Sequence, residues 1–306
     1  MTVRSLKSLS KNELEGLLES VDVVLCDCDG VLWRETEVIP GSPGSVEKLK
    51  QRGKKFFYVT NNNDKTREEL AEKCKGLGYN TSPDEIVCTS YMAAIYLKDK
   101  GFKKKVYIVG NNGIAKELDA VGISHTGLGR DIMEGNAMDV IENFKPDPEV
   151  GAVIVGFDTH FSYPKLVKAA TYATDPEVHF VGANPDRERP SPNGNKFPGT
   201  GCFIRAIESA AGRRAVVVGK PEPYVSEHLI RTYGLNPART LMIGDNCTTD
   251  ILLGKRCGFK TLLVLSGVTT ESDVIARSKS PSAEERSIVP DFYTDTLSDV
   301  CRLLEN

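Results

Sequence analysis

Two carboxylates stand where a buried strand is expected to end. The apolar run from Val21 to Leu25 predicts a short strand, and Asp27 and Asp29 follow it, two positions apart, with Gly30 next. Successive strand side chains alternate between faces, so both carboxylates lie on one side of the chain as it leaves the strand. Ionising both would cost free energy, because two neighbouring negative charges repel each other. Either one keeps its proton or a cation lies between them, and magnesium, which prefers oxygen ligands, is the natural candidate.

Alternating strands and helices must position these groups. Strands are predicted at residues 21–25, 54–59, 86–89, 106–110, 150–157, 179–182, 215–218, 240–243 and 261–265. Helical segments with short links separate them, which predicts an α/β fold with a Rossmann-like, doubly wound parallel sheet. The pattern restarts near residue 103. We therefore expect a discontinuous catalytic core, residues 1–102 and 215–306, and an α/β cap domain inserted at 103–214.

Polar residues follow three further strands of the predicted core. Thr60 and Asn61 come after one, Lys220 after another and Asp245 after a third. Ligands of parallel sheets bind at the carboxyl ends of the strands, so these residues are expected to meet at one edge of one sheet. Such a set suits a phosphate group, because a lysine and a cation held by aspartates neutralise the charge of phosphoryl transfer. One aspartate could attack phosphorus and the other could move the proton.

Each motif has a plainer interpretation when taken alone. An Asp-x-Asp-Gly sequence is typical of turns, and residues 60–63 could be a loop that caps the next helix. Lys220 could be a solvated lysine before a proline. Asp250, five residues after Asp245, could be a first-turn acid favoured by the helix dipole. The combination of all these motifs is far more specific than any one of them.

The motifs together resemble those of the haloacid-dehalogenase-type phosphatases. They are Asp27-Cys28-Asp29-Gly30-Val31-Leu32, Thr60-Asn61-Asn62, Gly219-Lys220-Pro221, and Gly244-Asp245 with Asp250. The resemblance covers nearly the whole chain. It extends to the group of phosphoglycolate phosphatases, pyridoxal phosphatases and 4-nitrophenylphosphatases with an α/β (C2-type) cap, and is closest to the phosphoglycolate phosphatases through residues 155–163 and 198–202.

The resemblance implies a role for each residue. Asp27 would be the nucleophile and Asp29 the acid and base. Magnesium would be held by Asp27, the backbone carbonyl of Asp29, and Asp245. Asp250 would support this site without binding the ion directly. The phosphate would be bound by Thr60, Asn61, Asn62 and Lys220. Two positions depart from the family pattern: Asn246 stands where arginine is frequent, and Asn63 where serine is common.

The predicted cap carries the candidate specificity loop, residues 184–190. Arg189 stands where the family resemblance suggests that a side chain enters the active site. An arginine there could form two parallel hydrogen bonds to a substrate carboxylate or second phosphate. A charged surface turn is the alternative for this loop. Gly199-Thr200-Gly201 opens a predicted helix and could bind an anion, act as a hinge or allow close packing.

The expected function is magnesium-dependent hydrolysis of small phosphate monoesters through an aspartyl-phosphate. The resemblance favours 2-phosphoglycolate and glycerol 3-phosphate, with 4-nitrophenyl phosphate as a model substrate. Pyridoxal 5′-phosphate is the alternative substrate, and a non-catalytic regulatory or binding protein of the same fold is the alternative class. A homodimer formed through the cap is expected by resemblance only.

The composition agrees with an enzyme of small metabolites. The chain has 306 residues and a net charge of −3, which argues against nucleic acid as a partner. No apolar run reaches the roughly 18 residues of a membrane span, and residues 1–10 lack the apolar core of a signal peptide. The eight scattered cysteines argue against zinc and for reduced thiols. We therefore expect a cytoplasmic protein without a membrane partner.

Overall fold

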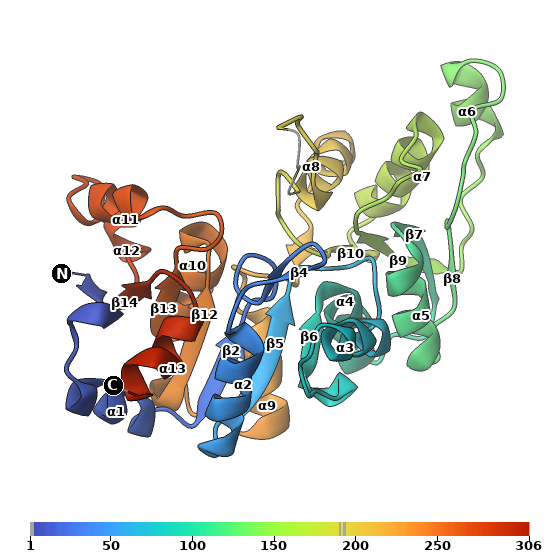
Figure 1. The fold of residues 1–306 in the computed structure, drawn as a ribbon. Helices are drawn as coiled ribbons and strands as arrows, with labels where there is room; N and C mark the ends of the chain where they lie inside the picture. The colour runs from blue at the N-terminus through green and yellow to red at the C-terminus, as the bar shows by residue number, and fades with distance from the viewer. Residues whose placement is uncertain (1–2, 190, 192–193, 306) are drawn as a thin grey trace. The chain divides into compact units, whose positions relative to one another are not determined.

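The computed structural model describes residues 3–189, 191 and 194–305, and the chain forms two compact units (Figure 1). The first unit comprises Met1–Thr60, Glu68–Val87 and Lys220–Asn306. The second comprises Asn61–Arg67 and Cys88–Gly219. The domain limits expected at 102/103 and 214/215 stay a prediction.

The first unit is built on a seven-stranded sheet. Its order is β1 (Arg4–Ser5), β14 (Phe292–Thr294), β13 (Lys260–Val264), β12 (Thr240–Gly244), β2 (Val23–Cys26), β5 (Lys55–Thr60) and β6 (Ile86–Cys88). The pairs from β1 through to β5 are all parallel. Every residue of β2 and β12 is buried, as expected for central strands covered on both faces. A short antiparallel hairpin of β3 (Trp33–Arg34) and β4 (Glu37–Val38) follows β2.

Helices cover both faces of this sheet. They are α1 (Lys11–Glu19), α2 (Ser42–Gln51), α3 (Arg67–Gly76), α9 (Tyr224–Tyr233), α10 (Leu252–Arg256), α11 (Glu271–Ser278), α12 (Ala283–Ser287) and α13 (Ser298–Glu305). In Figure 1, α2 and α13 lie in front of the strands and α9 lies behind them. Helix α1 begins at a capping box: Ser10 Oγ accepts from the Glu13 amide, and Glu13 Oε2 accepts from the Ser10 amide at 2.9 Å.

The second unit is built on a five-stranded parallel sheet. Its order is β11 (Val216–Val217), β10 (His179–Gly182), β9 (Val150–Val155), β7 (Lys105–Val109) and β8 (His125–Thr126). Its helices are α4 (Thr89–Asp99), α5 (Asn112–Ala120), α6 (Ala137–Asn143), α7 (Tyr163–Thr174) and α8 (Thr200–Ala211). Strand β9 is buried along its whole length, and α7 and α8 pack on it through an apolar cluster that includes Val153, Ala169 and Ile207.

These two parallel sheets with flanking helices confirm the predicted α/β class. One strand assignment was wrong. The strand before Lys220 was expected in the same sheet as β2 and β12, but β11 pairs in parallel with β10 in the five-stranded sheet. Lys220 itself belongs to the first unit, so the chain changes units between β11 and this lysine. Within the described part of the chain, the helices are too short or too polar to cross a lipid bilayer.

Candidate active site

Asp27 and Asp245 directly follow two neighbouring central strands. Strands β2 and β12 are paired with Cys26 opposite Ile243, and the Asp27 amide continues the ladder by donating to the Ile243 carbonyl at 2.9 Å. The two side chains therefore start from adjacent positions at the carboxyl edge of the sheet. Sequence reasoning predicted this juxtaposition from residues more than two hundred positions apart.

Lys220 lies buried among oxygen atoms of the same unit. Its Nζ is 2.6 Å from Asp27 Oδ1 and 2.7 Å from Asp250 Oδ1, and it donates to the Val59 carbonyl at 3.0 Å. An ammonium has three N–H groups, and these three oxygens are enough to accept all of them. Burial opposes the charge of this lysine, but the carboxylates of Asp250 and Asp27 outweigh it and raise its pKa. Lys220 is therefore a fixed positive charge beside Asp27.

Asp250 supports the lysine from a buried position. It belongs to a π-helical turn, Cys247–Ile251, and its Oδ2 accepts from the Asn246 amide at 3.1 Å. A Cβ atom at Gly244 would lie 2.1 Å from Asp250 Cβ, so glycine at 244 is what lets this side chain reach the lysine. Asp250 thus does more than serve as an acid in the first turn of a helix, which was its plainer interpretation. Asn246, the first departure from the family pattern, accepts from the Thr248 amide and hydroxyl and so begins this turn.

Three carboxylates come together around this lysine. One oxygen from each of Asp27, Asp245 and Asp250 lies within 4.8 Å of the others. Burial, and then the neighbouring carboxylates, raise the pKa of Asp245 to about 8. Burial likewise raises the pKa of Asp250 to about 6 and raises that of Asp27, although Lys220 opposes the change in both. The cluster holds more negative charge than one lysine can neutralise.

Two glycines and one amide fix the carboxylate of Asp245. Its Oδ2 accepts from the Val268 amide at 2.8 Å. A Cβ atom would come within 2.5 Å of this oxygen at Gly30 and within 1.8 Å at Gly267, so neither position tolerates a side chain without movement. Sequence reasoning missed Gly267 and Val268. Their only signal was a glycine shortly after the strand that pairs with β12.

Asp29 lies beside Trp33. The indole Nε1 donates to Asp29 Oδ1 at 2.9 Å, and a tight turn between the two residues brings them together. Thr60, the last residue of β5, is buried at the same edge of the sheet as Asp27. These positions agree with the ones expected from strand ends.

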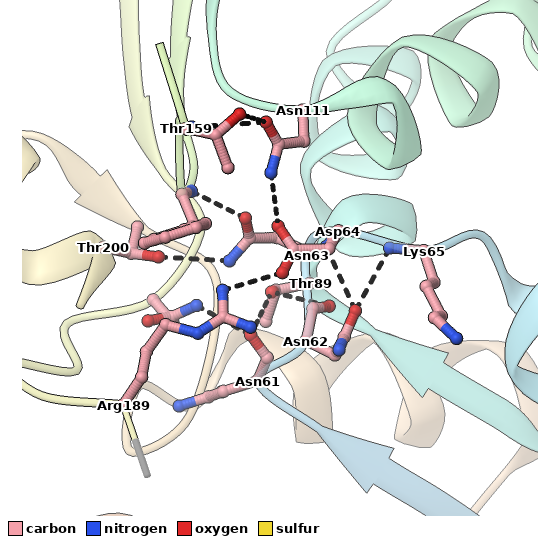
Figure 2. Close-up of polar contacts among 12 residues, drawn as sticks. Asn61, Asn62, Asn63, Asp64, Lys65, Thr89, Asn111, Thr159, Arg189 and Thr200 are labelled. Carbon is pink, nitrogen blue, oxygen red and sulfur yellow. Dashed lines mark hydrogen bonds and ion pairs between the residues drawn. The ribbon is translucent and has the colours of Figure 1, made fainter. Parts of the chain in front are cut away.

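Asn61 and Asn62 bind protein groups of the second unit (Figure 2). The Asn61 carbonyl accepts from Thr89 Oγ1, as Figure 2 shows, and from Asn184 Nδ2. The Asn61 side-chain amide donates to both carboxylate oxygens of Asp186 at 3.1 Å. Asn62 Oδ1 accepts from the amides of Asp64 and Lys65. Asn62 therefore begins a polar turn, and both of its bonds go to residues that precede the next helix, which begins at Arg67. The phosphate contacts expected of both residues stay a prediction.

Asn63, which stands where serine is common in the family, makes two side-chain hydrogen bonds. It is buried, its Oδ1 accepts from the Phe157 amide at 2.7 Å, and its Nδ2 donates to Thr200 Oγ1 at 3.2 Å (Figure 2). One asparagine thus joins the end of β9 to the start of α8. A serine hydroxyl can also donate and accept, but it does so from one oxygen close to the backbone, so it could not reach both groups as the two ends of the asparagine amide do.

Arg189 contacts a carboxylate and two aromatic rings. Its Nη1 is 2.7 Å from Asp64 Oδ2 (Figure 2). Its guanidinium carbon lies 4.2 Å from the ring centre of Phe157 and 5.4 Å from that of Phe197. The other Asp64 oxygen accepts from Asn111 Nδ2 at 3.0 Å. Sequence reasoning missed Asp64 as the partner of this arginine. Pro190, the last residue of the predicted specificity loop, lies outside the described residues.

The Gly199-Thr200-Gly201 segment packs against the same loop. The Gly201 amide donates to the Asp186 carbonyl at 2.8 Å, and a Cβ atom at Gly201 would lie 2.3 Å from the Pro185 carbonyl oxygen. Close packing, one of the three alternatives for these glycines, is therefore what they provide.

Comparison with known proteins places the chain in a family. A model of haloacid dehalogenase-like hydrolases matches residues 24–124, and one of HAD-hydrolase-like proteins matches residues 217–300. These two segments contain all four motifs of the sequence analysis.

Named relatives and solved structures agree with this assignment. The glycerol-3-phosphate phosphatase of Homo sapiens is 41% identical over 305 residues, which span 97% of this chain and 95% of the relative. Phosphoglycolate phosphatase 2 of Arabidopsis thaliana is 36% identical and covers 97% of this chain and 98% of its own. The p-nitrophenyl phosphatase of Archaeoglobus fulgidus superposes with a TM-score of 0.77 at 28% identity, covering 92% of this chain and 98% of its own. The chain therefore belongs to the haloacid dehalogenase-like hydrolase family and, within it, to the phosphatases.

Proposed function

We propose that this protein hydrolyses small phosphate monoesters with magnesium, through a phosphoryl group carried on Asp27. The observation that supports this most is the buried contact of Lys220 with Asp27 beside the carboxylates of Asp245 and Asp250. Phosphoryl transfer requires charge neutralisation around a nucleophile held in place, and this cluster supplies both.

The donor set fits magnesium. With all three carboxylates ionised and one ammonium among them, the cluster has a formal charge of −2, which a divalent cation balances. Carboxylate and carbonyl oxygens are the ligands that magnesium prefers. Asp27, Asp245 and the backbone carbonyl of Asp29 would hold the ion, whereas both oxygens of Asp250 are already engaged by Lys220 and the Asn246 amide. The bound ion would neutralise charge on the phosphoryl oxygens.

The residues of the chain then divide the reaction between them. In the first half, a carboxylate oxygen of Asp27 bonds to phosphorus, the bond from phosphorus to the leaving oxygen breaks, and Asp29 gives that oxygen a proton. In the second half, Asp29 takes a proton from water as the water oxygen bonds to phosphorus and the bond to Asp27 breaks. Lys220 holds Asp27 and stabilises negative charge throughout. Thr60, Asn61 and Asn62 would donate hydrogen bonds to the phosphate.

Phosphate release from a panel of metabolites tests the proposal. We expect turnover of 2-phosphoglycolate, glycerol 3-phosphate and 4-nitrophenyl phosphate that depends on magnesium, because relatives at 36–41% identity carry the first two names. Pyridoxal 5′-phosphate belongs in the same panel. Asp27→Asn removes the nucleophile and should abolish release of phosphate. Activity that persists in this variant would overturn the mechanism, and absence of activity in the unmodified protein would favour a binding protein.

Arg189 is proposed to select substrates with a second anionic group. Its side chain is 32% exposed and meets the carboxylate of Asp64, so a substrate carboxylate could share or replace that partner. Arg189→Ala should raise KM for 2-phosphoglycolate by about tenfold, the value of a charged hydrogen bond, and leave KM for 4-nitrophenyl phosphate nearly unchanged. Lys196→Ala is the matched control, because Lys196 is an exposed cation of the same region paired with Glu188. An equal rise for both substrates would contradict the role of Arg189.

Compartment and assembly complete the proposal. The eight cysteines are free thiols in the structure, which supports a reducing compartment such as the cytoplasm.

We also propose a homodimer formed through the cap, residues 103–214, as the family resemblance implies. Light scattering of the purified protein distinguishes the dimer from a monomer.

A further inference from the structure

A tight turn returns the chain to Asp29 directly after β2. The Cys28 carbonyl accepts from the amides of Leu32 at 2.8 Å and Trp33 at 3.2 Å, and the Gly30 amide donates to the Trp33 carbonyl at 2.7 Å. Gly30 has a φ of +84°, a conformation that glycine adopts without strain. The turn therefore places the indole of Trp33 beside the carboxylate four residues before it.

The indole is held rigidly in this place. Trp33 is 1% exposed, its ring meets that of Tyr79 edge-on at 5.7 Å, and Lys73 Nζ lies 4.5 Å from the ring centre. The turn itself is anchored at the Leu32 carbonyl, which accepts from Tyr79 Oη at 2.7 Å and from Ser42 Oγ at 3.0 Å. These contacts fix the orientation of the Trp33 ring. Its Nε1–H therefore donates to Asp29 Oδ1, with 2.9 Å between the nitrogen and the oxygen.

An indole N–H differs from the other hydrogen-bonding groups of this site. It donates only, so it can neither take the proton of Asp29 nor return one. By occupying Oδ1 it assigns the proton of a protonated Asp29 to Oδ2, and among the described residues Oδ2 has no donor of its own. When the proton leaves, the N–H stabilises the carboxylate that remains.

We propose that Trp33 is a positioning residue that orients Asp29 for proton transfer to the leaving oxygen, an inference that rests on the phosphatase mechanism proposed above. In that step the bond from phosphorus to the leaving oxygen breaks, and the proton passes from Asp29 Oδ2 to that oxygen. Trp33 contacts neither substrate nor phosphorus; it acts through Asp29.

The proposal separates good leaving groups from poor ones. An alkoxide is a poor leaving group and must gain a proton as its bond to phosphorus breaks, whereas 4-nitrophenolate leaves without one. Trp33→Phe keeps an aromatic ring against Tyr79 and removes the N–H. We expect kcat/KM for glycerol 3-phosphate to fall by about 10- to 100-fold and kcat/KM for 4-nitrophenyl phosphate by less than about threefold. This parameter reports the steps up to alcohol release, so slow hydrolysis of the aspartyl-phosphate does not hide the difference.

Two further proteins make the result decisive. The chain has a single tryptophan, so replacing Trp33 by 3-benzothienylalanine preserves the bicyclic shape and removes only the N–H; it should reproduce the selective loss even if Trp33→Phe folds poorly. Tyr79→Phe removes one bond that anchors the turn and keeps the indole N–H, so it should give a smaller loss than the benzothienylalanine protein, again mainly with glycerol 3-phosphate. Equal losses, or none, in the benzothienylalanine protein would overturn the role of Trp33. Failure of the unmodified protein to release phosphate from either substrate would instead overturn the proposed function.

Discussion

Two buried lysines of this molecule are surrounded differently. Lys165 of α7, in the second unit, lies 2.5 Å from Asp158, and the two side chains are 0% and 1% exposed. Lys220, in the first unit, is equally buried, but it meets both Asp27 and Asp250, with Asp245 close by. Asp158 also accepts from the His160 amide, so its second oxygen is engaged as well. The charges of Lys165 and Asp158 balance, and we call this arrangement the closed pair. Around Lys220 the carboxylates outnumber the ammonium.

The difference separates a structural ion pair from a reactive cluster. One ammonium and one carboxylate neutralise each other, and a buried pair of this kind fixes the segments that carry it. Three carboxylates around one ammonium leave negative charge that must be met by protons or by a cation. Burial of charge is common to both regions. The region proposed to be catalytic differs in its excess of negative charge. The following predictions test that distinction.

The largest expected effect is on stability, at the closed pair. Lys165→Met leaves the Asp158 carboxylate buried without its partner, which should lower the free energy of unfolding by about 3–5 kcal/mol. Urea denaturation followed by circular dichroism measures it. Lys165→Met combined with Asp158→Leu removes both charges and should recover most of the loss. If the single variant is as stable as the unmodified protein, the pair does not stabilise the second unit.

Lys220→Met should have its main effect on catalysis. The variant loses the fixed positive charge beside Asp27, and kcat/KM for 4-nitrophenyl phosphate should fall by about 10²- to 10³-fold, as when one preorganised electrostatic group is removed. The free energy of unfolding should change less than in Lys165→Met, because the carboxylates around Lys220 can take up protons or a cation. A stability loss as large as that of Lys165→Met, with activity retained, would make the two lysines equivalent and remove the distinction.

The smallest effect is a dependence of stability on pH and magnesium. The pKa of Asp245 is raised from an ordinary 3.8 to about 8, because it is buried beside other carboxylates. The folded protein therefore binds more protons than the unfolded chain between about pH 4 and 8, and without divalent cations its stability should fall as the pH rises through this range. On the proposed mechanism, magnesium would bind the ionised cluster and should restore stability at pH 8 more than at pH 5.

Thermal unfolding with and without magnesium measures this dependence. We expect the rise in Tm caused by the ion to be larger at pH 8 than at pH 5 by a few degrees, since about 1 kcal/mol shifts Tm by a few degrees in a domain of this size. Asp245→Asn should abolish most of the difference. A rise that is the same at both pH values would show that the cluster does not compete with protons for the ion.

Much of the first unit was predictable from local pattern. Strand ends follow from apolar runs that stop at polar residues, so the placement of Asp27, Asp245 and Thr60 at one sheet edge could be inferred from the parallel topology. The capping box at Ser10 is likewise a local feature, because its bonds join residues three positions apart.

The rest depends on contacts that no local pattern encodes. Residues 215–218 are apolar enough for either sheet, and only pairing with β10 decides which one they join. Asp64 meets an arginine 125 positions later, so its partner is fixed by the path of the 184–189 loop. The bond from Trp33 to Asp29 is local, yet it needs the unusual turn at Gly30, which the composition of the segment does not specify.

The strand order has a consequence for synthesis of the chain. The sheet of the second unit takes all its strands from residues 105–217, a continuous stretch, whereas β2 at residues 23–26 lies between β5 and β12, and β12 ends at residue 244. On a ribosome, the second sheet can pair while β2 still lacks one neighbour. The cluster of Asp27, Lys220 and Asp245 can therefore be completed only after residue 245 has been made. Until then, the edge of β2 that β12 covers in the folded protein has no strand to pair with.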